Sequence, residues 1–308
     1  MSLVLFLTRR VLAIVVLAWA VTLAAFALFR IGLKSPAMSA QISAQLGAGR
    51  PALAQYLSYL GRLLHGNLGQ TLTVGVSVTS LLRAALPPTV SLVAGGLVLW
   101  LVLGTLVGAI GALRPGTWVD WGISAAALAG LALPTFLTAL FLLQISSAID
   151  STPNAWLQPG YVPFTESPAQ WLGRLILPWI AIAATQVGVT ARLARGSMLE
   201  VLGEDYVRTA RANGVPARRV FWHHVLRPAI TPVISNITVG FGMLLGSAAI
   251  VDQVFALGGI GQALLVAVKS GDLMVIMGTA LLTFLLISVV SLIVDICQAL
   301  LDPRVRIA

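Results

Sequence analysis

Residues 84–113 read AALPPTVSLVAGGLVLWLVLGTLVGAIGAL and contain no charged side chain. A helix that crosses a lipid bilayer needs about 20 mostly apolar residues, so this stretch is long enough to span a membrane. A charged side chain in the middle of a span costs roughly 2.5 to 3.5 kcal/mol, so flanking charges mark the ends of such a run. Further charge-free runs that meet or approach this length are 11–29, 121–149, 175–191, 228–251 and 273–294. The sequence therefore predicts an all-α membrane protein with six transmembrane helices, over about 8–31, 86–113, 119–147, 172–194, 229–252 and 273–298.

The composition agrees with this class. The chain has 308 residues, of which 58% are hydrophobic and 9% charged, whereas a typical globular domain carries about 25% charged residues. These values exclude an ordinary soluble enzyme and a disordered protein, and the single cysteine, Cys297, excludes a disulfide scaffold. The net charge of +9 would suit a nucleic-acid partner, but basic loops beside membrane spans explain it better at a mean hydropathy of +0.96. We expect one membrane domain over 1–308 and no nucleic-acid partner.

The basic residues predict the orientation of the chain. With six spans both termini lie on one side, and that side holds twelve Arg and Lys residues against seven on the other. The positive-inside rule places the richer side, with both termini, in the cytoplasm. The external loops are then 33–83 and 150–173, and the cytoplasmic loop is 195–228. Residues 253–268 contain three glycines, so we expect a re-entrant or interfacial connector there and not a seventh span.

The first apolar run has two interpretations. It follows Arg9 and Arg10, as the core of a signal peptide would, and 37–40 would then be the processing site. Its nineteen residues exceed the usual signal core of about 7–15 residues, so an uncleaved first span is favoured.

The cytoplasmic loop is patterned. Residues 204–212 (EDYVRTARA) predict a short helix with acidic side chains in its first turn, where the helix dipole favours them. Asn213-Gly214 predicts a left-handed stop. A second helix over 217–227 is expected to begin after Pro216 and to end before Pro228. A plain basic loop that only sets topology is the alternative. A helix-turn-helix DNA-binding domain is excluded, because two short tethered helices lack its third helix and its core.

These residues resemble a known family. Residues 205–215 (DYVRTARANGV), together with Arg218-Arg219-Val220, His224–Arg227 and Pro232–Ile234, closely resemble the coupling loop of ABC importer permeases, and in particular the B-type permeases of the dipeptide/oligopeptide branch. The resemblance extends to GNLGQT at 66–71, to Phe255 with GGIG at 258–261 and Asp272, and to LDPRVR at 301–306.

The chain departs from the family pattern at a few positions. The general signature has Glu-Ala-Ala at 208–210, where this chain has Arg-Thr-Ala. Asn213 replaces a common Lys, and Pro228 a common Asn. The external segment 33–54 is shorter than usual and has Lys34-Ser35-Pro36 in place of a Gly-Asp-Pro element.

The resemblance implies a type I ABC importer permease fold with a cytoplasmic coupling helix, in the inner membrane of a bacterium. It implies ATP-driven transport of di- or oligopeptides by alternating access, with nickel or glutathione as alternative substrates of the same branch. The implied partners are a homologous second permease subunit, two ABC ATPases, an extracytoplasmic substrate-binding protein and the lipid bilayer. The residues implied to couple to the ATPase are Glu204, Asp205, Tyr206, Val207, Arg208, Thr209, Ala210, Arg211, Ala212, Asn213, Gly214 and Val215. Gly214 would allow either close backbone approach or a turn with positive φ, and Arg208 and Arg211 would pair with acidic ATPase residues.

The chain itself is not expected to be an enzyme. It has no phosphate-binding Gly-x-x-x-x-Gly-Lys-Ser/Thr motif and no His-Glu-x-x-His or Cys-x-x-Cys motif. The adjacent His223 and His224 point to different faces of a helix, so they are a poor metal pair. We expect no cofactor in this chain, and ATP with Mg²⁺ in the partner ATPases.

Few polar residues fall within the spans. Gln186, Asn236 and Asp252 are the candidates for the substrate path, and Asp295 is a further acid near membrane depth. Hydrogen bonding between helices is the favoured alternative for Gln186 and Asn236, and simple contact with water is the alternative for the two acids. A secondary transporter would carry buried ionisable relays and broken helices, and a membrane enzyme would carry a cluster of titratable residues. Neither pattern is evident, so a transport subunit is favoured.

Overall fold

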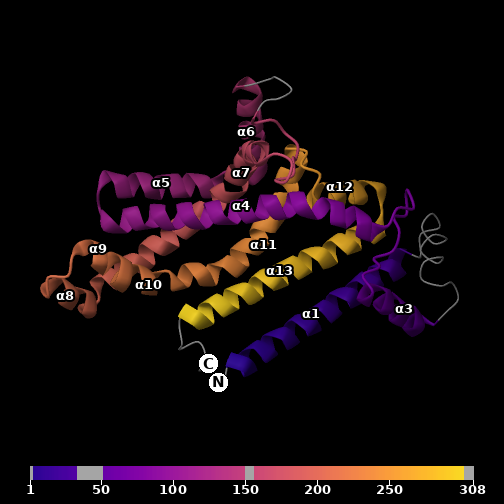
Figure 1. Cartoon of the computed structure of the whole chain (residues 1–308), viewed down its shortest axis with the longest axis horizontal. Helices are drawn as coiled ribbons and strands as arrows, with labels where there is room; N and C mark the ends of the chain where they lie inside the picture. The colour runs from indigo at the N-terminus through magenta and orange to yellow at the C-terminus, as the bar shows by residue number, and fades with distance from the viewer. Residues whose placement is uncertain (1–2, 33–50, 150–155, 302–308) are drawn as a thin grey trace.

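The computed structural model describes residues 3–32, 51–149 and 156–301 (Figure 1). Within these ranges the regular secondary structure is helical, apart from an isolated bridge between Gln70 and Ser77, and loops and turns connect the helices. The longest helices are α1 (Leu3–Gly32), α4 (Val78–Leu113), α7 (Pro168–Gly203), α11 (Thr231–Val254) and α13 (Leu273–Leu301). The shorter ones are α3 (Ala52–Leu64), α5 (Trp118–Ala132), α6 (Thr135–Ile149), α8 (Asp205–Ala212), α9 (Ala217–Arg219), η1 (Val220–Val225), α10 (Leu226–Ala229) and α12 (Ile260–Ser270).

The five long helices are each long and apolar enough to cross a membrane, and α5 with α6 would make a sixth span if the bent pair counts as one. This count agrees with the predicted all-α membrane fold. The straight span expected over 119–147 is divided, because α5 and α6 meet at an angle of 101°. The cause is Pro134, which disfavours a helical conformation at the residue before it. Leu133 accordingly has an extended backbone, with φ −83° and ψ 119°.

The core of the bundle is the contact between α4 and α7. A Cβ atom added at Gly104 would lie 2.8 Å from the Thr190 side chain, and one at Gly108 would lie 2.6 Å from the Ala191 carbonyl oxygen. Only glycine allows this approach of the two backbones. The Trp100 indole lies fully buried beside these glycines and donates a hydrogen bond to the Thr190 hydroxyl. The two helices therefore pack as a close pair, and the remaining helices surround them.

Helix α1 lies on the outside of this core, beside α13 (Figure 1). Arg10 of α1 forms an ion pair with Asp295 of α13, with the Arg10 Nη2 and Asp295 Oδ1 atoms 2.7 Å apart. Further along, Phe26 packs against the rings of Tyr56 and Tyr59 on α3. Asp295 therefore has a charged partner inside the chain, which explains an acid in this otherwise apolar helix.

The expected connector at 253–268 contains the short helix α12. The Asp252 carboxylate accepts hydrogen bonds from the backbone N–H groups of Gly259, at 2.9 Å, and Gln262, at 2.8 Å. These are groups at the start of α12 that have no partner within the helix. The Thr89 hydroxyl accepts a third, from the Ile260 N–H. Asp252 therefore holds α12 against α11, and Thr89 holds it against α4.

Candidate functional site

Helix α8 follows α7 directly and lies with α9 and α10 at the left-hand end of the bundle in Figure 1. The chain turns at Glu204, whose extended backbone (φ −68°, ψ 145°) ends one helix and caps the next. Asp205 lies in the first turn of α8, where the helix dipole stabilises a negative charge. The predicted short helix is present at the expected place.

The C-terminal end of α8 is a complete Schellman motif. The Val215 N–H donates to the Ala210 carbonyl at 3.2 Å, and the Gly214 N–H donates to the Arg211 carbonyl at 3.0 Å. Gly214 has a φ of +77°, and among the described residues no atom beyond Gly214 and its two chain neighbours lies within 4 Å of the position that a Cβ atom would take. Of the two roles considered for Gly214, the turn with positive φ is therefore the one that the structure of this chain displays.

One face of α8 is anchored on the chain itself. Val207 is fully buried and Ala210 is 9% exposed, and both belong to a cluster with Met198 of α7 and Val220 and Val225 of η1. An isolated helix of about eight residues is not stable in water. Packing of its apolar side chains against the rest of the chain therefore stabilises α8 and fixes its direction. The position of α8 therefore follows the end of α7.

The opposite face of α8 is open. Arg208 and Arg211 are exposed, as predicted for two residues three positions apart on one face. Arg208 lies 3.6 Å from Asp205, but the two side chains are 72% and 97% exposed. Such an exposed ion pair adds little to the stability of the chain, so the Arg208 guanidinium remains available to pair with an outside partner. The exposed residues among the predicted coupling residues are Glu204, Asp205, Tyr206, Arg208, Thr209, Arg211, Ala212, Asn213 and Gly214.

The second predicted helix differs from expectation at its end. It runs as α9, η1 and α10 without a break and ends at Ala229, so the prediction that it stops before Pro228 was wrong. Proline has no N–H, and in an α-helix the N–H at this position would bond to the carbonyl four residues earlier, that of His224. The Tyr206 hydroxyl donates to this carbonyl instead, at 3.2 Å. Partial desolvation raises the pKa of Tyr206, and the Glu204 carboxylate adds to this effect. The Tyr206 side chain of α8 thus supplies a donor for the His224 carbonyl, to which Pro228 cannot donate.

The candidate residues for the substrate path do not form one cluster. Gln186 is buried in α7 and donates to the Gly240 carbonyl of α11 at 2.9 Å, which is the hydrogen bonding between helices named as its alternative. Asn236 is half-buried on α11, one turn before Gly240. Asp252 lies twelve residues beyond Gly240, about 18 Å along the helix at 1.5 Å per residue. Among the described residues no group of three or more metal-binding side chains occurs.

Sequence reasoning missed the interactions that join distant parts of the chain. These are the ion pairs Arg10–Asp295 and Arg195–Asp120 and the hydrogen bond from Tyr206 to His224. Asp295 was noted as an acid near membrane depth without a partner being named, and the other charged residues were used only to place the ends of apolar runs or the basic loop. A lone charge at the edge of a predicted span, with an opposite charge at the edge of another on the same side, is the signal that was available.

The fold and this site define a helical membrane protein with several spans that presents one anchored, exposed helix at the end of its bundle. The chain belongs to the family described as binding-protein-dependent transport system inner membrane component, whose model matches residues 100–307. The family is that of the permease components of ABC transporters, so the chain is a permease subunit that is not itself catalytic. Membership implies a membrane location and ATPase and substrate-binding partners.

Proteins of similar sequence extend the match beyond the family model. The "Putative peptide transport system permease protein" of Brucella abortus (strain 2308) is 35% identical over 273 residues, which cover 88% of this chain and 86% of the relative. The di/tripeptide transport system permease protein DppB of Pseudomonas aeruginosa (strain UCBPP-PA14) is 33% identical, with 98% of each chain covered.

A solved structure has a similar fold. It is that of the MetNI methionine ABC transporter in inward-facing conformations, with a TM-score of 0.58, an identity of 18%, and coverage of 72% of this chain and 97% of that chain. At this identity the likeness shows the fold alone. It is the type I importer permease fold that the sequence predicted.

Proposed function

We propose that this chain is a permease subunit that imports di- or oligopeptides across the cytoplasmic membrane, driven by ATP hydrolysis in separate ATPase subunits. The relatives support the peptide substrate, since those described above are peptide or di/tripeptide permeases by name. Both termini and the 195–228 loop face the cytoplasm in this proposal, as the distribution of basic residues indicates.

The observation that carries the proposal is the two-sided character of α8. Its Val207 and Ala210 face is buried on α7 and η1, while its Arg208 and Arg211 face is open and positively charged. A helix held in this way transmits a push from a partner to the bundle, because it cannot shift without moving the end of α7. Closure of the ATPases around ATP would press on α8 and convert the bundle from inward-open to outward-open.

The remaining partners complete the proposed machine. A homologous second permease subunit would form the other half of the path, and an extracytoplasmic binding protein would dock on the external loops 33–83 and 150–173. Residues 33–50 and 150–155 lie outside the described residues. ATP and Mg²⁺ would bind only to the two ATPases. They would engage Glu204–Val215 of this chain through the exposed side chains.

The substrate path is proposed to run along α11. Asn236 is the residue of the three candidates for which we propose direct contact with the peptide. Gln186 and Asp252 would shape the path indirectly, because the first ties α7 to α11 and the second holds α12. A path with few charges suits zwitterionic peptides of varied side chain, since no single strong contact holds the substrate back.

The proposal is tested by purification of the tagged chain from its own membrane in mild detergent, followed by mass spectrometry and reconstitution into liposomes. We expect a second permease, ATPases and a binding protein to copurify, and a labelled dipeptide to enter only with ATP on the ATPase side. Nickel and glutathione are offered as competing substrates, and uptake of either one in place of the dipeptide would change the assigned substrate. Accumulation by the chain alone without ATP would replace the proposal with a secondary transporter.

A further inference from the structure

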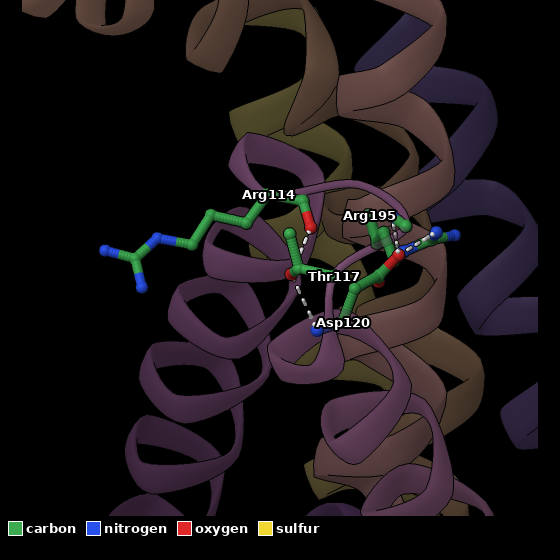
Figure 2. A network of polar contacts seen from close by, with 5 residues as sticks. Arg114, Thr117, Asp120 and Arg195 are labelled. Atoms are coloured by element: carbon green, nitrogen blue, oxygen red, sulfur yellow. Dashed lines mark hydrogen bonds and ion pairs between the residues drawn. The ribbon is translucent and has the colours of Figure 1, made fainter.

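A partly buried ion pair joins α5 to α7 at the end of the bundle that carries α8 (Figure 2). The Arg195 Nε atom lies 2.5 Å from Asp120 Oδ1, and Arg195 Nη2 lies 2.7 Å from Asp120 Oδ2. Both carboxylate oxygens are therefore held by the planar guanidinium, an arrangement that fixes direction as well as distance. Asp120 is 4% exposed, and the Arg195 side chain is 31% exposed.

The same carboxylate organises the turn between α4 and α5. The Gly116 N–H donates to Asp120 Oδ2 at 3.0 Å. The Thr117 hydroxyl caps α5 by accepting from the Asp120 N–H, and it donates to the Arg114 carbonyl at 2.7 Å. Figure 2 shows the Arg114 side chain pointing away from this network. Asp120 thus connects three partners, namely the turn, the start of α5 and α7.

The C-terminal end of α4 packs against the Asp120–Arg195 ion pair. A Cβ atom added at Gly111 would lie 3.2 Å from the Arg195 Cδ atom and 3.3 Å from Asp120 Oδ1, which leaves little space for a side chain there. The ends of α4, α5 and α7 therefore meet at a single charged contact.

This contact lies close to the part of α7 that carries α8. Ala194 and Met198 flank Arg195 on α7, and both are fully buried in the cluster that holds Val207 and Ala210 of α8. Arg195 precedes the last residue of α7, Gly203, by about 12 Å of helix at 1.5 Å per residue. A displacement of α8 therefore reaches Arg195 through packed side chains before it reaches the middle of the membrane.

We propose that Asp120 and Arg195 are a positioning pair for energy coupling, which makes the adjoining ends of α4, α5 and α7 move with α8 as one rigid body. The proposal rests on the transport function proposed above. A buried ion pair adds little net stability compared with well-packed apolar side chains, but it specifies one geometry, and that is what transmission of a small displacement requires.

The first test separates rigidity from transport. Two spin labels are placed on exposed positions of a Cys297→Ser chain, one on α5 by Trp118→Cys and one on α7 by Glu200→Cys. In the purified chain alone we expect a narrow distribution of distances between the labels, and a broader one after Asp120→Asn or Arg195→Met. Equal widths in all three proteins would overturn the proposal, whatever the chain transports.

The second test measures coupling in the reconstituted complex as solute transported per ATP hydrolysed. The variant that replaces both partners, Asp120→Leu with Arg195→Met, removes the charges together and leaves no buried charge alone, so we expect it to melt at the wild-type temperature. We expect its transport per ATP to fall by about two- to thirty-fold, the range by which residues in such contact networks change coupling. The control is Arg114→Gln, which removes a charge from the same turn outside the network, and it should transport normally.

The outcomes of the second test are distinct. Unchanged transport per ATP in the folded double variant would refute the positioning role. A wild-type complex that transports nickel or glutathione and no dipeptide would refute only the proposed substrate, because the coupling ratio is then measured with that solute.

Discussion

The glycine at position 214 allows a quantitative test of the α8 site. Because φ is +77° and the space around its Cβ position is empty, a substitution acts only through the backbone. Alanine costs about 1 to 2 kcal/mol in the left-handed region, which corresponds to a loss of about 5- to 30-fold in the ratio of the native turn to other conformations. Asparagine tolerates this region better. Proline fixes φ near −65° and removes the N–H that donates to the Arg211 carbonyl.

These costs predict an order of activity. Transport per ATP should decrease from Gly214 through Gly214→Asn and Gly214→Ala to Gly214→Pro, while insertion and melting temperature of the membrane bundle stay close to wild type. The assay is ATP-driven uptake by proteoliposomes with ATP hydrolysis measured in parallel. Gly196→Ala is the matched control, since Gly196 lies inside α7 with open space around it, and alanine should stabilise a helix there by about 0.5 to 1 kcal/mol. Wild-type coupling in Gly214→Pro would refute the role assigned to the Schellman turn.

Three further predictions concern charges and hydroxyls around the same machinery. Reversal of Arg208 and Arg211 to Glu should leave the fold intact and abolish copurification with the ATPases; retained copurification would show that this face is not the contact. Tyr206→Phe should lower the stability of the loop by about 0.5 to 1.5 kcal/mol, since the His224 carbonyl loses its donor, measured as faster proteolysis after α8 compared with wild type. Asp295→Asn should destabilise the chain by about 0.2 to 1 kcal/mol, because its half-exposed arginine partner on α1 loses a charged acceptor but stays solvated, and an unchanged melting temperature would contradict the importance of this ion pair.

Local features of the chain were predictable where one physical effect dominates. The charge-free runs around 84–113 and 273–294 became α4 and α13. In lipid a helix exposes apolar side chains and pairs its backbone N–H and C=O groups within the segment. The end of α8 was predictable from Asn213-Gly214, because only a residue that tolerates positive φ continues the chain there at low cost.

Other features depended on competition between local and distant effects. Pro134 is visible in the sequence, but the span predicted over 119–147 took no account of it, and the helix breaks there. At Pro228 the predicted end did not occur: the helix continues to Ala229, and the Tyr206 hydroxyl donates to the His224 carbonyl. The same residue type ends a helix in one place and not in the other. The difference lies in the neighbours and not in the proline.

The amino-acid sequence by itself determined which segments form helices long and apolar enough to cross a membrane, which loop is basic and where the short helix of that loop ends. These are local properties, since hydrophobicity, charge and backbone preference act within about one helix. The tertiary structure alone decided that Asp120 faces Arg195, that Asp252 holds α12 and that Val207 anchors α8 on α7. Each of these contacts joins residues whose meeting depends on how the helices pack, and close packing of α4 on α7 through their small residues sets that arrangement.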